Sequence, residues 1–269
     1  MRDLLERFPP PEPAIGPWFR QISEALLREA ALSVGGQRHT ILEVEVYYRT
    51  PDHPDPFVHG DDHQRSVLRW YLHRTGGGLR SGTFKGIDLT FGRDAIGGIL
   101  IRTLKTPEGK VINGSSLCVD HILRRLGLSG VAALDAAIAD QDADNPDNPL
   151  RLVERPAQSE PIWATARVGL TLKRVAQYPS MEQYLLRPYR FLSDPRAVRK
   201  GRVYLIMALH QQGHPPHQIR EITGSPRRTI EKYIDAFAQG AKVSDGKRWH
   251  GRTLDAVAIC QLHGVGRSG

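Results

Sequence analysis

Apolar and polar residues alternate along residues 40–49, and this period of two predicts a β-strand. The stretch is rich in β-branched and aromatic residues, which strands favour. Successive side chains of a strand point to opposite faces, so Glu43, Glu45 and Tyr47 share one face. A carboxylate between two valines loses part of its hydration and suits general-base work. The same pattern fits a solvent-exposed face with two ordinary acids, and the strand alone leaves both interpretations open.

The same kind of pattern predicts the elements around this strand. Apolar residues at helical spacing predict a helix over 18–34, which Gly35-Gly36 ends. Residues 67–73 fit a strand or a short helix. Further strands are predicted at 82–92 and 97–104, and further helices at 115–126, with a serine N-cap, and at 129–139. We therefore predict a mixed α/β (α+β) fold, with one domain around a curved antiparallel sheet over residues 1–195.

Arg102 is the charged residue of the otherwise apolar stretch 97–104. A guanidinium buried on a strand needs an anionic partner. That partner is either a structural carboxylate, or a phosphate or the Glu45 site.

The last quarter of the chain has the spacing of a helix-turn-helix. Helical stripes cover residues 201–212 and 217–223, and a third helix is predicted at 225–238, with Ser225 as its N-cap and Pro226 at its first position. The third helix is then the recognition helix. Side chains suited to phosphates and base edges occupy its start, namely Arg227, Arg228, Thr229 and Lys232. The alternative is a three-helix packing module without a role on DNA.

Charge is distributed unevenly between these two parts. Residues 196–269 contain 13 of the 37 Lys and Arg but only 5 of the 29 Asp and Glu, so the rest of the chain holds 24 of each. The whole net charge of +8 therefore lies in the C-terminal quarter. A basic module on a neutral body indicates a polyanionic partner, most simply double-stranded DNA. We predict a DNA-binding module over 196–269 whose end, from 241, is a partly ordered tail.

Other features narrow the class of protein. No run approaches the roughly 18 apolar residues of a membrane span, and the first residues have no apolar signal core, so we expect no membrane partner and a cytoplasmic, nucleoid-associated location in a bacterium. Two cysteines, Cys118 and Cys260, make no disulfide framework. His53, His59 and His63 fit no standard ligand spacing. We expect no metal and no cofactor, and a monomer.

Several short stretches resemble the alkyladenine (3-methyladenine) DNA glycosylase family. The strand Glu43-Val-Glu-Val-Tyr47 resembles that family's Glu-x-Glu-x-Tyr strand. Three more stretches match in the same order, namely Ile99-Leu-Ile-Arg-Thr-Leu104, Gly114-Ser-Ser-Leu-Cys118, and Ala166-Arg-Val-Gly169 with Arg187-Pro-Tyr-Arg-Phe191. The resemblance covers residues 18–195, and the helix-turn-helix lies outside it.

The resemblance implies a monofunctional DNA glycosylase, a hydrolase that flips a base out of the duplex and cuts its N-glycosidic bond, as in base excision repair. Glu45 would then activate the water that attacks the sugar C1′, and Arg102 would hold that water and the flipped nucleotide. Tyr47 would stack on the base, and His59 would reach the edge of the base. No lysine matches a Schiff-base position, which favours simple hydrolysis.

The chain departs from the family in the strand after Gly82-Thr83. Phe91, or Thr90 in another register, would be the residue that wedges into the duplex. Gly86, Ile87 or Asp88 stands where the family has a second stacking aromatic, so the pocket is expected to be roomier and more polar. Two substrates follow: alkylated purines, in DNA repair, or bulky phage-modified cytosines such as glucosylated hydroxymethylcytosine, in antiviral defence. A DNA-binding regulator with a glycosylase-like sensor domain is the alternative, and an RNA- or nucleotide-acting hydrolase also stays open.

Overall fold

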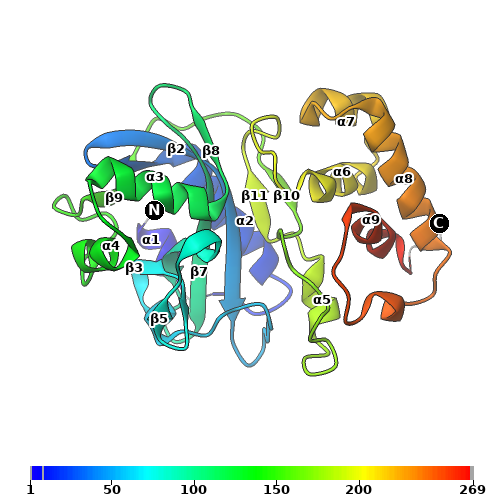
Figure 1. Ribbon diagram of the computed structural model, residues 1–269, viewed down its shortest axis with the longest axis horizontal. Helices are drawn as coiled ribbons and strands as arrows, with labels where there is room; N and C mark the ends of the chain where they lie inside the picture. The colour runs from blue at the N-terminus through cyan, green and yellow to red at the C-terminus, as the bar shows by residue number, and fades with distance from the viewer. Residues whose placement is uncertain (1, 8, 267–269) are drawn as a thin grey trace. The chain divides into compact units, whose positions relative to one another are not determined.

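The computed structural model describes residues 2–7 and 9–266 and divides the chain into two compact units (Figure 1). The first comprises the described residues of 1–162 together with 191–194, and the second those of 163–190 and 195–269. Residues 163–190 thus belong with the C-terminal helices, whereas the sequence placed the boundary at 195.

A large antiparallel sheet forms the first unit. Its central strand β2 (Gln37–Arg49) pairs with β7 (Ile96–Lys105), and β6 (Ile87–Phe91) and β3 (Val67–Leu72) follow in that order. The remaining strands of this unit are β1 (Ala30–Val34), β9 (Leu150–Glu154), β8 (Val111–Asn113), the end of β11 (Arg190–Leu192) and the small hairpin β4 (Arg74–Thr75) with β5 (Gly78–Leu79). The predicted mixed α/β fold around an antiparallel sheet is confirmed.

The two faces of β2 have different chemistry. Val44, Val46 and Tyr48 alternate onto the face that packs against helix α2 (Ile15–Glu29), where Tyr48 lies 5.7 Å, ring centroid to centroid, from Phe19. Glu43, Glu45 and Tyr47 share the opposite face. Residues 41–46 are buried throughout, so the acids do not form the solvent-exposed face that the sequence left open.

The predicted helix over 18–34 is wrong at its end. Helix α2 stops at Glu29, and Ala30–Val34 forms β1, which pairs with β2 and with β9. Gly35 and Gly36 adopt φ values of +55° and +81°, and two consecutive left-handed residues make the tight turn of a β-hairpin. The glycine pair therefore turns one strand into the next, and β1 is buried along its whole length because it pairs on both sides.

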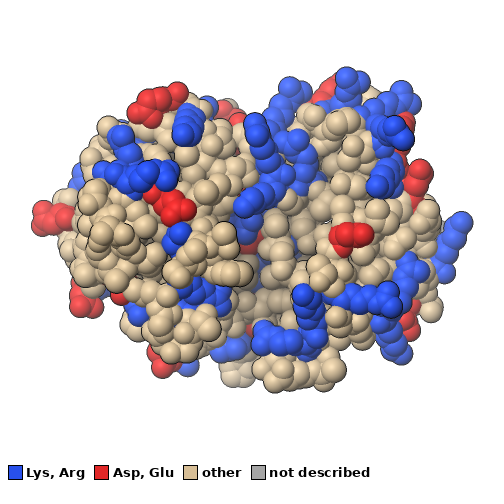
Figure 2. Space-filling model, viewed as in Figure 1, with Lys and Arg blue, Asp and Glu red and all other residues tan. Residues whose placement is uncertain are grey.

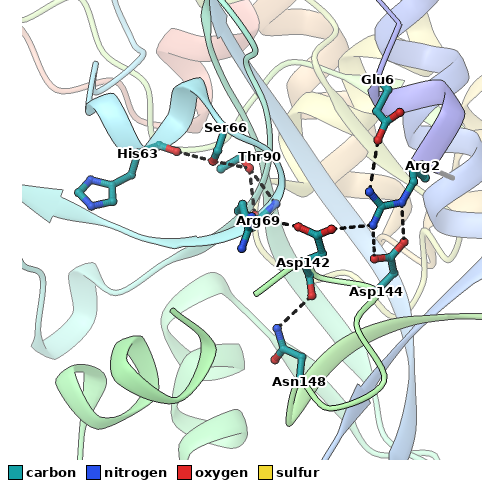
Figure 3. A network of polar contacts seen from close by, with 9 residues as sticks. All are labelled: Arg2, Glu6, His63, Ser66, Arg69, Thr90, Asp142, Asp144 and Asn148. Carbon is teal, nitrogen blue, oxygen red and sulfur yellow. Dashed lines mark hydrogen bonds and ion pairs between the residues drawn. The ribbon is translucent and has the colours of Figure 1, made fainter. Parts of the chain in front are cut away.

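Short helices complete this unit: α1 (Arg2–Leu5), η1 (Asp62–Arg65), η2 (Gly82–Phe84), α3 (Ser115–Leu126) and α4 (Val131–Ile138). Helix α3 ends at Gly127 in the left-handed conformation, as its glycine predicts, but its N-cap is Gly114, not a serine. Figure 3 shows how α1 is anchored: Arg2 pairs with Asp142 at 2.8 Å and with Asp144 at 2.6 Å.

The second unit contains β10 (Trp163–Thr165), α5 (Met181–Leu185), α6 (Arg202–Gln211), α7 (Pro216–Thr223), α8 (Arg227–Ala241), η3 (Lys247–Trp249) and α9 (Ala256–Gly264). Ala166, Tyr204 and Ile259 meet in its core. Helix α9 lies against α8, and a Cβ at Gly240 would approach the Gln261 carbonyl oxygen to 1.9 Å. The predicted tail from 241 contains the ordered helix α9, because Gly240 and Gly264 let α8 and α9 pack closely. No helix in the described part of the chain is long and apolar enough to cross a membrane.

Candidate active site

Glu45, Tyr47 and Arg102 meet on the polar face of β2 and β7. The Tyr47 hydroxyl donates to Glu45 Oε2 at 2.8 Å, and Arg102 Nη1 donates to the same oxygen at 3.3 Å. Glu45 is fully buried, and Arg102 is 8% exposed. The structure thus brings together the predicted base, stacking ring and arginine, and it holds the carboxylate of Glu45 by two donors from different residues.

Glu43 is the second carboxylate of this cluster. Arg102 Nε donates to Glu43 Oε1 at 3.2 Å, and the Thr103 hydroxyl donates to Glu43 Oε2. Arg102 and Thr103 are neighbours on a strand and would ordinarily point to opposite faces. A register shift places Glu43 opposite Thr103 and Val44 opposite Ile101, which leaves Arg102 bulged out of the pairing. The bulge lets both side chains reach Glu43.

Two acids share one guanidinium at this site. Burial by itself lowers the pKa of Arg102, but the carboxylates of Glu45 and Glu43 outweigh it, and the pKa lies above its usual value. Arg102 therefore stays charged, and the formal charges of these three side chains sum to −1. A buried anionic cluster stabilises positive charge that develops next to it.

A second polar group occupies the same sheet face. The strand register sets Glu45 opposite Leu100, Leu100 opposite Asp88, and Asp88 opposite Tyr71 in one row across β2, β7, β6 and β3. Asp88 Oδ1 lies 2.7 Å from His73 Nε2, and both residues are buried. Directly paired residues point to the same face, so Asp88 and Glu45 are groups of one surface.

His59 belongs to this second group rather than to the Glu45 cluster. Its exposed ring lies 5.1 Å, centroid to centroid, from the ring of His73, and its Nδ1 is 3.2 Å from Arg80 Nη2. Gly86 is also here, because a Cβ at this glycine would lie 2.6 Å from the His73 ring. Two predicted pocket residues, His59 and Gly86, thus come together around a histidine that the sequence did not single out.

Phe91 does not face solvent. Its ring is 1% exposed and stacks on Tyr48 at 5.7 Å, with Trp18 at 5.5 Å on the α2 side of the sheet. A ring in the core cannot enter a duplex without breaking that packing. The expectation of Phe91 as the wedge is therefore wrong.

Thr90 is equally unsuited to a wedge. It is fully buried, and its hydroxyl contacts Ser66 Oγ at 3.0 Å, the Arg69 N–H at 3.0 Å and the Arg69 carbonyl at 3.1 Å (Figure 3). These bonds hold β6 to β3 where their register shifts. The role of Thr90 in this structure is to join two strands.

Phe84 is a large apolar side chain that no sequence pattern singled out. It is 74% exposed at the end of η2. The Ser116 hydroxyl donates to the Gly82 carbonyl at 3.0 Å, and Lys85 pairs with Asp120 at 2.9 Å, so η2 is attached to α3. Helix α3 begins next to Arg102, whose carbonyl accepts from the Gly114 N–H. A phenylalanine in a loop gives no sequence signal of its exposure, which only packing decides.

The predicted DNA-binding side chains occupy the first two turns of α8. Arg227 and Arg228 are exposed, Lys232 is exposed one turn further, and Thr229 is half-buried. Arg227 pairs with Glu231 at 2.7 Å, one turn along the same helix. Helices α6, α7 and α8 follow one another along the chain as predicted, and each packs against the other two. Figure 2 shows Lys and Arg side chains over α7 and α8.

The predicted cap of α8 is wrong. Ser225 is 2% exposed, and its N–H donates to Thr223 Oγ1 at 3.1 Å, so it belongs to the turn. Pro226 occupies the N-cap position without a side-chain cap. The tight turn after Gly224, which is left-handed at φ +67°, moves the serine inside.

Metal ligands do not cluster in the described part of the chain. No group of three or more His, Cys, Asp or Glu residues there could hold a metal ion. The His39 and His121 rings do meet, with their Nε2 atoms 2.8 Å apart.

The chain is similar to a mimivirus protein. No protein-family model matches the chain. The uncharacterized protein L759 of Acanthamoeba polyphaga mimivirus is 26% identical over 204 residues, which are 70% of this chain and 91% of the viral protein. The name of that relative states no activity, so we infer the function of this chain from its own residues.

Proposed function

We propose that this protein is a monofunctional DNA glycosylase with Glu45 as its general base. The observation that carries the proposal is the buried Glu45 carboxylate, held by the Tyr47 hydroxyl and the Arg102 guanidinium on the polar face of the sheet. A buried carboxylate with fixed donors is preorganised to take a proton from water. The resemblance to the alkyladenine DNA glycosylases motivates the substrate, a modified base in DNA.

The chemistry is a hydrolysis in which each residue has a distinct role. Water attacks the sugar C1′ and gives its proton to Glu45, while the C1′–N bond breaks and its electron pair leaves with the base. The sugar develops oxocarbenium character, and the negative sum of Glu43, Glu45 and Arg102 stabilises that charge. Tyr47, bonded to Glu45, would place its ring against the flipped base, and Arg102 would orient the water.

The C-terminal helices would supply affinity for the duplex. Arg227, Arg228 and Lys232 lie exposed on the start of α8, where side chains of a helix-turn-helix contact phosphates and base edges. Phe91 and Thr90 are buried. Phe84 is an exposed aromatic side chain on η2, which is attached to α3, the helix that begins next to Arg102. We assign the duplex-wedging role to Phe84.

The decisive experiment measures abasic sites. Duplexes that carry a single alkylated purine, or a single glucosylated hydroxymethylcytosine, are incubated with the protein, treated with alkali and scored for strand cleavage. We expect release of at least one of these bases, and a loss of about 10²–10⁴-fold in Glu45→Gln. Glu154→Gln, an exposed acid on β9, is the matched control and should keep full activity. Activity in Glu45→Gln equal to that of the control would remove the proposed role of Glu45.

The second candidate is a DNA-binding regulator, which the exposed basic side chains of α8 favour. A regulator binds one duplex sequence tightly and is indifferent to base modification. Binding measured on matched duplexes with and without the modified base separates the two: an enzyme prefers the modified duplex, and a regulator prefers a sequence.

A further inference from the structure

We propose that His73, positioned by Asp88, is a specificity-determining residue that accepts a hydrogen bond from the exocyclic amino group of the flipped base. This inference rests on the proposed function and names the class of base that the same site takes: cytosine- or adenine-type bases rather than their oxo counterparts.

Asp88 sets the polarity of the His73 ring. Asp88 Oδ1 lies 2.7 Å from His73 Nε2, and Gln64 Nε2 donates to Asp88 Oδ2 at 3.2 Å. Asp88 and Gln64 are each 1% exposed. A carboxylate accepts, so Nε2 carries a proton, and among the neutral tautomers Asp88 selects the one with its lone pair on Nδ1. In that tautomer His73 Nδ1 is a hydrogen-bond acceptor.

The Nδ1 acceptor of His73 is not used within the described part of the protein. Among the described residues, His73 Nδ1 has no hydrogen-bond partner. A Cβ at Gly86 would lie 2.6 Å from both Nδ1 and Cε1 and 3.0 Å from Cγ, over the face of the ring, so only glycine at this position lets the ring keep its place.

The partner of this ring, Asp88, lies on the same sheet face as Glu45. Asp88 and Glu45 are in one row of one sheet face, with Leu100 between them. Two inter-strand spacings separate their backbones by roughly 10 Å. Glu45 would act at the sugar C1′, and the base extends from C1′ toward its far edge. A group two strands away on the same face is placed to read that edge.

The chemistry of the acceptor selects the base. Cytosine and adenine present an exocyclic amino group, which donates, whereas uracil and hypoxanthine present a carbonyl oxygen at the same position. A lone pair on Nδ1 attracts the first kind and repels the second. The exposed His59 ring, 5.1 Å from His73, lies at the solvent side of this contact.

The test compares amino and oxo versions of one base. Rates of base release are measured on duplexes that differ only in 5-hydroxymethylcytosine versus 5-hydroxymethyluracil, and in adenine-type versus hypoxanthine-type lesions. We expect wild type to prefer the amino base, and His73→Phe to lower the amino-to-oxo ratio of kcat/KM about tenfold, the loss of one hydrogen bond. Gly86→Ala, which keeps His73 but displaces its ring, should lower the same ratio. Gly16→Ala, where a Cβ meets nothing within 4 Å, should leave it unchanged.

A second measurement does not depend on catalysis. Glu45→Gln protein with ¹⁵N-labelled histidine is mixed with the same duplexes, and the His73 Nδ1 resonance is followed by NMR. A shift with the amino base alone supports the contact, even if no base is released and the proposed hydrolysis fails. Base release with an unchanged ratio in both His73→Phe and Gly86→Ala overturns the inference and leaves the hydrolysis standing. Neither release nor any shift overturns both.

Discussion

The charged side chains of the sheet face and those of α8 differ in one respect, their contact with water. Glu43, Glu45 and Arg102 are buried, and Arg102 donates a hydrogen bond to each of the two carboxylates. Arg227 and Arg228 are exposed at the start of a helix, and the Arg227–Glu231 pair is exposed as well. Buried charges interact strongly and in a mutually dependent way, whereas exposed charges are screened and act almost independently. The first arrangement suits chemistry and the second suits affinity for a polyanion.

Replacing an arginine by methionine should lower stability far more on the sheet face than on α8. Arg102→Met removes the cation that Glu43 and Glu45 share, and two buried acids without their partner should cost about 3–5 kcal/mol of unfolding free energy. Arg228→Met removes an exposed cation and should change stability by less than about 0.5 kcal/mol. Urea denaturation of both variants at neutral pH measures this. Equal, small losses would show that the cluster tolerates unpaired acids.

Substitutions of the two acids of the sheet face should have different effects on base release. Glu43→Gln keeps a hydrogen-bonding side chain against Thr103 and Arg102 and should retain most of the base release, because the acid that faces Tyr47 is Glu45. Glu45→Gln should lose about 10²–10⁴-fold in kcat with unchanged DNA affinity. Single-turnover rates and binding isotherms of both variants check this. A loss of equal size in Glu43→Gln would make the pair, and not Glu45, the catalytic unit.

Removing each basic side chain of α8 should lower DNA affinity by a small and additive amount. Arg228→Ala and Lys232→Ala should each weaken binding of any duplex by a similar factor and reduce the slope of log Kd against log salt by about 1. Arg227→Ala should have a smaller effect, since Glu231 already engages Arg227. Fluorescence anisotropy at several salt concentrations measures both quantities. An unchanged salt slope in Arg228→Ala would place the DNA elsewhere.

The stability of the protein should also depend on pH, through the half-buried His121. Burial, and then the neighbouring His39, lower the pKa of His121 to about 4. The unfolded chain protonates this group near its usual pKa of about 6.5, and the folded protein does so only near 4. Stability from this group is therefore complete above about 6.5 and falls as the pH drops from there toward 4.

His121→Gln should flatten this part of the stability profile, measured as the urea midpoint between pH 7.5 and pH 4.5. His217→Gln, an exposed histidine on α7, should leave the profile as in wild type. A parallel decline in wild type and His121→Gln would assign the pH dependence to other groups.

Local sequence patterns determined several structural features of this protein. The period of two placed Glu43, Glu45 and Tyr47 on one face of a strand, the lone Arg102 in an apolar run indicated a buried anionic partner, and helical stripes located α6, α7 and α8. These properties depend on near neighbours in the chain, so the sequence contains them. The charge asymmetry between the two parts of the chain is likewise a property of composition alone.

Other properties depend on partners far along the chain, and only the tertiary structure decided them. Phe91 is in the core and Phe84 is exposed because strand pairing turns one ring toward α2 and leaves the other at the end of η2. Residues 30–34 form a strand because β2 and β9 flank them. Asp88 and His73 come into line with Glu45 through the register of three strand pairs, which no local pattern specifies. Register is set by packing across the sheet. Here that packing placed Asp88 and His73 in the candidate site with Glu45.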